Sequence, residues 1–494
     1  MSGALAWALG IFSTSILSTL PLGARSGGHA AFAASLSNSA RVYLPGSPEF
    51  ADASVRWSAA QTPRYDAIVK VATEEDVQKT ILYANYYSKP FLAISGGHGT
   101  TTMIDGVKNG IGILMGGMDN VSIVDDGSAA VIQGGVSNGD LLPYLWSHGK
   151  QTVTTGCDCV GYIAPILGGG HGWLQGRYGL AADQLMSARM VLANGTALTV
   201  SEASNPDLFW AIRGAGHNFG VVTQVKMKVY TVKPAEKQWA TSGFFFTHDR
   251  LEDVFALANT WLHSTTVQPA GMVHYAVFAH NPAVDPVNPI IVMWIYWQGA
   301  AIPPEYTDPL QALAPFAVDE SVGDLPALNT HLFADRNGAA CAKGFSRATV
   351  PVGLDSYSLP ALRRVLDMFA AMPSPFRSSV MMLEGYATHR VAQIPAPSTA
   401  FPDRETRLLL SPVLTWPRNA SLDAAGWELG SKIRDTLVDV SESDKTLKAY
   451  VNYARGDETL QEMYGSEPWR LTKLRRLKRE YDPHGRFNFY APIV

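Results

Sequence analysis

The stretch Phe91–Gly106, FLAISGGHGTTTMIDG, places a histidine between glycines directly after an apolar run. The apolar residues 91–94 predict a buried strand, and the segment 95–99, SGGHG, predicts the turn that follows it. Glycine lets the backbone approach a ligand closely and leaves N–H groups available to anions. The stretch therefore predicts a strand that ends in a ligand-binding turn containing His98.

The residues before this turn complete a small α/β unit. Residues 65–72, YDAIVKVA, predict a strand, and residues 73–87 show helical spacing after a capping-box-like Thr73-x-x-Asp76. Residues 89–95 form the second predicted strand. Further along, residues 121–135 predict a hairpin that turns at Asp126-Gly127, and residues 137–149 predict a helix.

A second glycine-rich segment, GCDCVGYIAPILGGGHGWLQGRYGLAADQL, runs from Gly156 to Leu185. Two glycine turns suggest a ligand that carries phosphate, although neither a G-x-G-x-x-G dinucleotide fingerprint nor a P-loop is present. His98 lies on one turn and Cys157 on the other. An imidazole and a thiolate are the side-chain nucleophiles best suited to bonding an electrophilic carbon of a flat ring ligand.

The character of the chain changes after about Lys233. Glycine becomes rarer, and long alternating strands such as GMVHYAVFAH, PIIVMWIYWQG and SSVMMLEGY occur between amphipathic helices. This pattern predicts a second domain with an antiparallel sheet covered by helices. We therefore expect a ligand-binding domain over 34–232, a substrate domain over 233–447 and a segment over 448–494 that returns to the first domain.

Composition narrows the class of protein. A chain of 494 residues with 47 % hydrophobic residues exceeds one small core, and two or three domains are expected. A net charge of −4 gives no drive toward nucleic acid or an anionic membrane. The three cysteines, Cys157, Cys159 and Cys341, form no disulfide framework, and their spacing predicts no metal site.

The N-terminus predicts export. Its first 24 residues are uncharged and mostly apolar, and residues 31–33, AFA, match a signal-peptidase site, so we expect a signal peptide over 1–33. Sequons at Asn120, Asn194 and Asn419 agree with a secreted or endomembrane protein. The alternative is an ordered N-terminal helix of a cytoplasmic protein. The second Ser-Gly-Gly-His, at residues 26–29, lies at this boundary, and we expect no site at His29.

Several long motifs resemble the berberine bridge enzyme-like family, within the vanillyl-alcohol oxidase and p-cresol methylhydroxylase superfamily. ISGGHGTT resembles that family's R-S-G-G-H segment, and residues 156–185 resemble its long glycine motif. DLFWAIRGAGHNFGVVT, TAFPDR, YVNYARGD and YDPHGRF are similar to later segments in the same order. The resemblance covers the chain from about Pro63 to its end.

The resemblance implies an α+β fold, with a two-part p-cresol methylhydroxylase-type FAD-binding domain and an α/β substrate domain built on a large antiparallel sheet. It implies FAD as the cofactor, with His98 bonded to the flavin 8α carbon and Cys157 at the position whose sulfur bonds flavin C6. The remaining residues expected to bind FAD are Ser95, Gly96, Gly97, Gly99, Thr100, Gly156, Val160, Gly161, Gly168, Gly169, Gly170, Gly172, Tyr178, Gly179, Gly220, Val222 and Asn452. The diglycine turns and Gly168–Gly170 are expected to hold the diphosphate through backbone N–H groups.

Three departures from the family pattern are visible. Ile94 replaces the arginine, Ile163-Ala164 replaces a diglycine, and Ser411-Pro412 stands where the catalytic glutamate is expected. The general base must therefore come from elsewhere, and the candidates are His274, Tyr275, Tyr296, Glu384 and Tyr450.

The expected activity is that of an FAD-dependent oxidase. Hydride would pass from a small organic alcohol, amine or C–H substrate, of the secondary-metabolite kind, to covalently bound flavin, and O2 would reoxidise the flavin. A carbohydrate oxidase of the same fold and a non-redox cyclase or binding flavoprotein are the alternatives. The substrate and the oligomeric state are left open.

Overall fold

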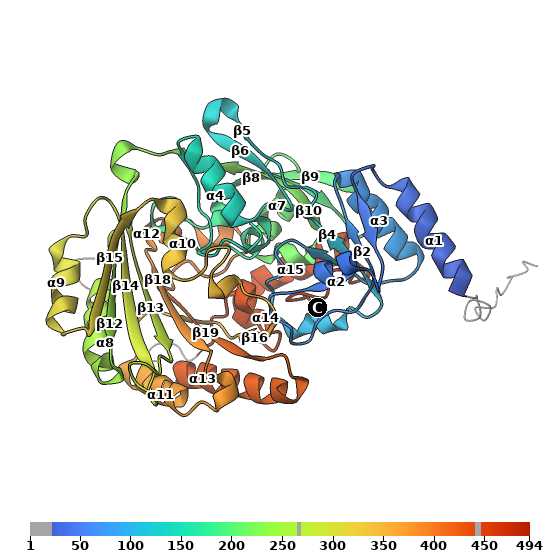
Figure 1. The fold of residues 1–494 in the computed structure, drawn as a ribbon. Coiled ribbons are helices and arrows are strands. Elements are labelled where there is room, and N and C mark those ends of the chain that lie inside the picture. The colour runs from blue at the N-terminus through green and yellow to red at the C-terminus, as the bar shows by residue number, and fades with distance from the viewer. Residues whose placement is uncertain (1–21, 264–267, 440–445) are drawn as a thin grey trace, which may run out of the picture.

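The computed structural model describes residues 22–263, 268–439 and 446–494. Within these ranges the chain builds a four-stranded, a five-stranded and a two-stranded sheet and one large sheet, and Figure 1 shows the large sheet at the opposite side of the molecule from the four- and five-stranded sheets. The smaller sheets come from the N-terminal half, and the large sheet comes from residues from Trp239 onward. The expected α+β architecture with a large antiparallel sheet is confirmed, while the boundaries at 232 and 447 stay a proposal.

The first sheet is the α/β unit around the quoted stretch. Its strands lie in the order β1-β2-β4-β3, with β4 parallel to both β2 and β3. The helix over 74–86 begins with the predicted capping box between Thr73 and Asp76, and it buries Val77 and Ile81 against the sheet. The elements are α1 (Leu22–Ser35), β1 (Arg41–Tyr43), α2 (Pro48–Ser54), β2 (Tyr65–Lys70), α3 (Glu74–Tyr86), β3 (Phe91–Ile94) and β4 (Gly110–Leu114).

The second sheet is antiparallel, in the order β5-β6-β10-β8-β9. Its first hairpin turns over Asp125–Gly127, as predicted, and Asn194-Gly195 lies in the turn between β8 and β9. The strands are β5 (Val121–Val124), β6 (Ala129–Gln133), β8 (Leu185–Val191), β9 (Ala197–Ser201) and β10 (Val221–Lys228), and β7 (Lys150–Gln151) pairs with β11 (Tyr230–Thr231). The helices of this part are α4 (Asn138–Ser147), α5 (Ile163–Ile166), α6 (Gln175–Tyr178) and α7 (Pro206–Ala215).

The large sheet is antiparallel, in the order β15-β12-β14-β13-β18-β19-β16, and β17 also pairs with β19. Helices α8, α11 and α13 cover one of its faces (Figure 1). The strands are β12 (Trp239–Phe246), β13 (Met272–Ala279), β14 (Ile290–Gln298), β15 (Ala317–Gly323), β16 (Phe345–Thr349), β17 (Val352–Leu354), β18 (Val380–Tyr386) and β19 (Leu408–Pro417). The helices are α8 (Leu251–His263), α9 (Pro304–Ala312), α10 (Leu328–His331), α11 (Leu359–Ala370), α12 (His389–Gln393) and α13 (Asp423–Asp439).

The last segment returns to the N-terminal sheets. After α14 (Leu460–Tyr464), helix α15 (Pro468–Tyr481) contacts α7, and Lys473 and Arg476 both pair with Asp207 at the start of that helix. In Figure 1, α14 and α15 lie among the elements of the N-terminal half. The large sheet is therefore formed by residues that lie, in sequence, between two segments that pack against each other.

The described residues include only part of the signal peptide predicted over 1–33. Residues 1–21 of the predicted signal peptide lie outside the described residues. The predicted cleavage site at 31–33 lies within α1, where the ring of Phe32 stacks on Tyr83 at 4.1 Å and His29 Nδ1 lies 2.9 Å from Tyr83 Oη. Among the described residues, no helix combines the length and apolarity needed to cross a membrane.

Candidate functional site

The turn after β3 offers a row of free backbone donors. Gly97 has φ +71°, a conformation that favours glycine, and a Cβ on Gly96 would lie 2.6 Å from the carbonyl oxygen of Cys159. Among the described residues, the amides of residues 96–100 have no protein acceptor. Since backbone N–H groups are rarely left without partners, this row suits an anionic ligand.

Arg56 places a positive charge beside this turn and so favours a negatively charged ligand. Its side chain is buried and donates from Nη2 to the carbonyl oxygen of Gly99 at 3.0 Å, while its Nε has no partner. No carboxylate of the described residues pairs with it. Burial lowers the pKa of Arg56, as expected for a cation with no counter-ion. A buried, uncompensated guanidinium beside free amides fits the diphosphate of FAD.

His98 is held by stacking. Its ring lies 5.1 Å from the ring of Trp57 at an interplanar angle of 19°, and neither ring nitrogen has a hydrogen-bond partner among the described residues. Burial, together with the positive charges of Lys343, Arg347 and Arg56, lowers the pKa of His98 to about 3. The imidazole is therefore neutral at physiological pH, with a lone pair available as a nucleophile.

The second glycine segment packs directly against the first. A Cβ on Gly161 would clash with Ser95 Oγ, which itself donates to the carbonyl of Gly134 at 3.0 Å. Gly156 is close to the large sheet, because a Cβ there would lie 3.5 Å from Tyr386 Oη. Cys157, between these glycines, therefore lies near both the first turn and the face of the large sheet.

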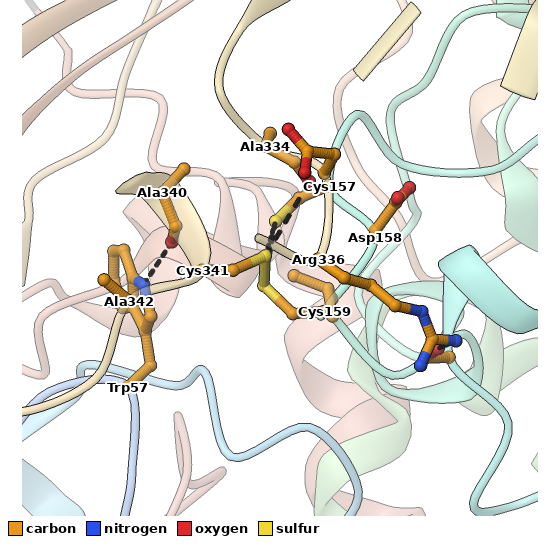
Figure 2. The surroundings of a disulfide bond; sticks show 12 residues. Trp57, Cys157, Asp158, Cys159, Ala334, Arg336, Ala340, Cys341 and Ala342 are labelled. Carbon is orange, nitrogen blue, oxygen red and sulfur yellow. Dashed lines mark hydrogen bonds between the residues drawn. A yellow bond between two sulfur atoms is a disulfide. The ribbon is translucent and has the colours of Figure 1, made fainter. Parts of the chain in front are cut away.

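The cysteines correct the sequence-based expectation. Cys159 and Cys341 form a disulfide, although we predicted no disulfide framework, and Cys157 is the free cysteine. Figure 2 shows the Cys157 side chain beside this bond, with its Sγ 3.4 Å from Cys159 Sγ and 3.8 Å from Cys341 Sγ. The partners are 182 residues apart in sequence, so no local spacing could have revealed them. Burial raises the pKa of the Cys157 thiol to about 11.

The triglycine has a different environment from the first turn. The amides of Gly168 and Gly169 donate to the carbonyls of Pro165 and Ile166, and the amide of Gly170 donates to Tyr450 Oη. These three amides therefore already have protein acceptors, whereas the amides of residues 96–100 have none among the described residues.

The other expected cofactor residues make contacts within the protein. Thr100 Oγ1 lies 2.6 Å from Thr349 Oγ1, and the Val160 carbonyl accepts from both nitrogens of Asn138. Three of the glycines lie where a side chain would clash with a neighbour: Gly172 lies against Thr154, Gly179 against Asp183 and Gly220 against Met190. Tyr178 stacks on Tyr230, and Val222 is buried in β10.

A buried carboxyl group, that of Glu384, lies on the large sheet next to tyrosine side chains. Glu384 on β18 is opposite Tyr275 on β13, so the two side chains share one face. Tyr453 donates from its hydroxyl to Glu384 Oε1 at 3.0 Å. Burial raises the pKa of Glu384 to about 7, although hydrogen bonds from Tyr386 and Tyr453 act in the opposite direction. A carboxyl group with this pKa is suited to accept a proton near neutrality.

The Glu384–Tyr453 pair is connected to the first glycine turn through Thr349. Thr349 Oγ1, which contacts Thr100, donates to the Tyr453 carbonyl at 2.8 Å. We did not single out Tyr453 or Tyr386 from the sequence. The available signal was the position of Tyr453 three residues after Tyr450 in YVNYARGD, within a segment already assigned to the site.

Tyr450 organises the triglycine. Its hydroxyl oxygen accepts hydrogen bonds from the amides of Gly170 and His171, at 3.2 and 3.3 Å, and from Asn452 Nδ2 at 2.7 Å. Burial raises the pKa of Tyr450 to about 12, and the three donors partly offset that effect. Its ring lies 5.1 Å from Tyr453, next to the Glu384 pair.

Two other candidates for the base have different surroundings. His274 points to the face opposite Tyr275, where its Nε2 lies 3.0 Å from Tyr357 Oη and its ring lies against Trp261 of α8. Burial lowers the pKa of His274 to about 3. Tyr296 lies 4.7 Å from Trp173, and burial raises its pKa. Of the residues named from the sequence, the structure brings Tyr275, Glu384 and Tyr450 together and places His274 elsewhere.

The residue that replaces the expected glutamate has a structural role. Ser411 is fully buried on β19, and its hydroxyl accepts from the amide of Val350 at 3.1 Å. It pairs in the ladder with Met382, two residues before Glu384. The adjacent strand β18 therefore carries a buried carboxyl group, Glu384, two residues from the partner of Ser411.

Two family models and several curated proteins match this chain. A family model described as FAD binding domain matches residues 65–201, and one described as berberine and berberine like matches residues 449–494. The FAD-linked oxidoreductase chry5 of Gibberella zeae is 39 % identical over 477 residues, 93 % of each chain. The FAD-linked oxidoreductase chyH of Penicillium rubens is 36 % identical over 495 residues, 99 % of this chain and 98 % of its own.

Solved structures show the same fold. Physcomitrella patens BBE-like 1 has a TM-score of 0.78 at 21 % identity over 92 % of this chain and 97 % of its own. Glucooligosaccharide oxidase from Acremonium strictum has a TM-score of 0.79 at 20 % identity over 94 % and 99 %. Taken with the free amides, the uncompensated Arg56 and the curated relatives, these matches lead to one conclusion: the chain belongs to the berberine bridge enzyme-like family of FAD-linked oxidoreductases and is an enzyme that uses FAD.

Proposed function

We propose that the chain is an FAD-dependent oxidase that removes a hydride from a small organic alcohol, amine or C–H substrate and passes the electrons to O2. The observation that carries the proposal is the buried Glu384–Tyr453 pair, with a carboxyl pKa of about 7, on the sheet face next to Cys157 and the first glycine turn. FAD, when bound, supplies the acceptor for the hydride.

The residues of the chain would divide the remaining work. Glu384 in its carboxylate form takes the proton from the substrate O–H or N–H group, either directly or through the Tyr453 hydroxyl that donates to it. Tyr275 and Tyr386 are buried beside Glu384 and exclude water from this proton. The missing glutamate on β19 thus leaves the site with a carboxyl base on β18.

We further propose that the flavin is attached through His98 and through Cys157. The name of the Acremonium strictum enzyme records a 6-S-cysteinyl, 8α-N1-histidyl FAD, and this supports the proposal at the level of a shared fold. In this chain, the neutral, unpartnered imidazole of His98 and the free thiol of Cys157 lie on two turns in contact. The row of amides at 96–100 and Arg56 would hold the diphosphate.

Flavin reduction by substrate tests the function. The purified enzyme is mixed anaerobically with a panel of alcohols, amines and oligosaccharides, and the flavin absorbance is followed; hydrogen peroxide is measured in air. We expect an alcohol or amine to bleach the flavin and to release peroxide. Bleaching by oligosaccharides only would favour the carbohydrate alternative. Conversion of a substrate without bleaching would reject the oxidase in favour of a non-redox flavoprotein.

We also propose a secreted or endomembrane location. The Cys159–Cys341 disulfide is typical of an oxidising compartment, and the asparagines of all three sequons are exposed. Treatment with an endoglycosidase should increase the mobility of the protein purified from its host on a denaturing gel. Unchanged mobility, together with an intact N-terminus beginning at residue 1, would reject export.

A further inference from the structure

The 328–345 strap crosses from the large sheet to the cofactor side of the molecule. It begins with α10 and ends where β16 starts. Along its length, Asn329 Nδ2 donates to Asp158 Oδ1 at 2.7 Å, and the Ala334 carbonyl accepts from the Asp158 amide at 2.9 Å. The Cys159–Cys341 disulfide fastens its far end to the second glycine segment. Figure 2 shows Asp158 and Ala334 close to the disulfide.

Trp57 is held by this strap. Its indole Nε1 donates to the carbonyl of Ala340, the residue before Cys341, at 2.7 Å. Arg347, two residues after the strap, donates from Nη1 to the Trp57 carbonyl at 2.8 Å and to the Ala342 carbonyl at 2.6 Å, with its guanidinium 4.7 Å from the centroid of the Trp57 ring. The ring of Trp57 is therefore fixed at its edge and its face by groups next to the disulfide.

Trp57 in turn contacts the first glycine turn. Its amide donates to the Gly97 carbonyl at 3.2 Å, and its ring stacks on the ring of His98. A histidine that reacts at one nitrogen is usually oriented by a hydrogen bond at the other. Within the described part of the chain, His98 has no such bond. The stacking contact is thus the interaction available to set the direction of its lone pair.

Resting on the proposed attachment of FAD through His98, we propose that Trp57, held by the strap that the Cys159–Cys341 disulfide fastens, is a positioning residue that orients the His98 imidazole for attachment to the flavin. Attachment forms one bond between an imidazole nitrogen and the flavin 8α carbon. One C–H bond and one N–H bond break, the electron pair reduces the flavin ring, and dioxygen takes up two electrons and two protons to become hydrogen peroxide. Loss of the stack or of the disulfide slows this step without abolishing FAD binding.

The test isolates the His98 bond. All variants carry Cys157→Ser, so that flavin in the acid-precipitated protein reports attachment through His98, while flavin in the supernatant reports FAD bound without a covalent link. Purified protein is incubated in air with excess FAD and sampled over time by in-gel fluorescence and intact mass. The variants are Trp57→Leu, Trp57→Phe, the double change Cys159→Ser with Cys341→Ser, and Trp469→Leu as the matched control at an exposed tryptophan.

We expect Trp57→Leu and the disulfide-free variant to attach flavin about ten- to a hundredfold more slowly, because a misaligned nucleophile reacts at such a disadvantage. Trp57→Phe keeps an aromatic ring and should restore most of the rate, and Trp469→Leu should equal the background protein. If Trp57→Leu takes up no FAD at all, the test rests on the attachment rate of the disulfide-free variant, which keeps Trp57. An unchanged rate in Trp57→Leu or in the disulfide-free variant overturns the proposal. A background protein that never retains flavin in the precipitate instead contradicts attachment through His98.

Discussion

At the scale of single residues, the proposed role of Glu384 as the base has a consequence for the pH range in which the enzyme is expected to work. Its pKa of about 7 in the folded protein is caused by burial, so the carboxylate that accepts a proton is populated only as the pH rises above that value. The hydroxyl of Tyr453 is the donor that stabilises the charged form.

We therefore predict that kcat rises with pH through about 7, and that Glu384→Gln lowers kcat by about 10²- to 10⁴-fold and removes this limb of the profile. The measurement is the rate of flavin reduction as a function of pH. Tyr453→Phe should keep the limb but shift it to higher pH, since one hydrogen bond to the carboxylate is lost. A limb near 7 that persists in Glu384→Gln would mean that another group is the base.

The proposed bonds to the flavin also depend on single residues. We predict that His98→Ala and Cys157→Ala each retain the flavin mass after acid precipitation, and that the double variant loses it. His29→Ala is the matched control, because it alters the other Ser-Gly-Gly-His segment, and it should behave as wild type. If Cys157→Ala leaves attachment unchanged and His98→Ala abolishes it, His98 forms the single bond.

At the scale of elements, a buried ion pair joins the loop before β19 to the segment before β8. Arg404 donates from Nη1 and Nη2 to the two carboxylate oxygens of Asp183, at 2.7 and 3.0 Å, and both side chains are almost fully buried. Asp183 Oδ2 also accepts from the amide of Leu180 at 2.8 Å. The pair thus ties the end of the second glycine-rich segment, at 181–184, to the loop before β19.

We predict that Arg404→Met destabilises the protein by about 3–5 kcal/mol, because it leaves a buried carboxylate without its partner. Arg363→Met is the matched control: it breaks an equally well-formed pair with Glu252 on the surface of α8 and α11, and it should cost about 0–1 kcal/mol. Urea denaturation midpoints compare the two. Equal losses would show that burial of the Arg404 pair has no energetic consequence.

At the scale of the whole molecule, the disulfide joins the two parts of the chain. It closes a loop with a sequence separation of 182 residues, and the entropy that such a cross-link removes from the unfolded chain corresponds to roughly 5 kcal/mol. The strap also carries an ion pair between Arg336 and Asp140 of α4, which fastens it a second time to the cofactor side.

We predict that the double change Cys159→Ser with Cys341→Ser lowers the thermal unfolding midpoint by several degrees, in keeping with a loss of a few kcal/mol. Differential scanning calorimetry provides the measurement, and Cys157→Ser is the control because Cys157 is outside the disulfide. If wild type treated with a reductant unfolds at the same temperature as untreated wild type, the bond contributes nothing to stability.

The sequence by itself determined the local features of this protein. Glycine, a capping box and the alternation of apolar residues act over a few residues, so the turn around His98, the helix at Thr73, the hairpin at Asp126 and the antiparallel sheet after Lys233 could all be predicted. Only the tertiary structure decided which distant residues meet. Glu384 and Tyr453 are 69 positions apart, Cys159 and Cys341 are 182 apart, and Trp57 reaches Ala340 across 283. The physical reason is that residue patterns record local conformation and burial, whereas these contacts arise from how the large sheet and the strap pack against the cofactor side.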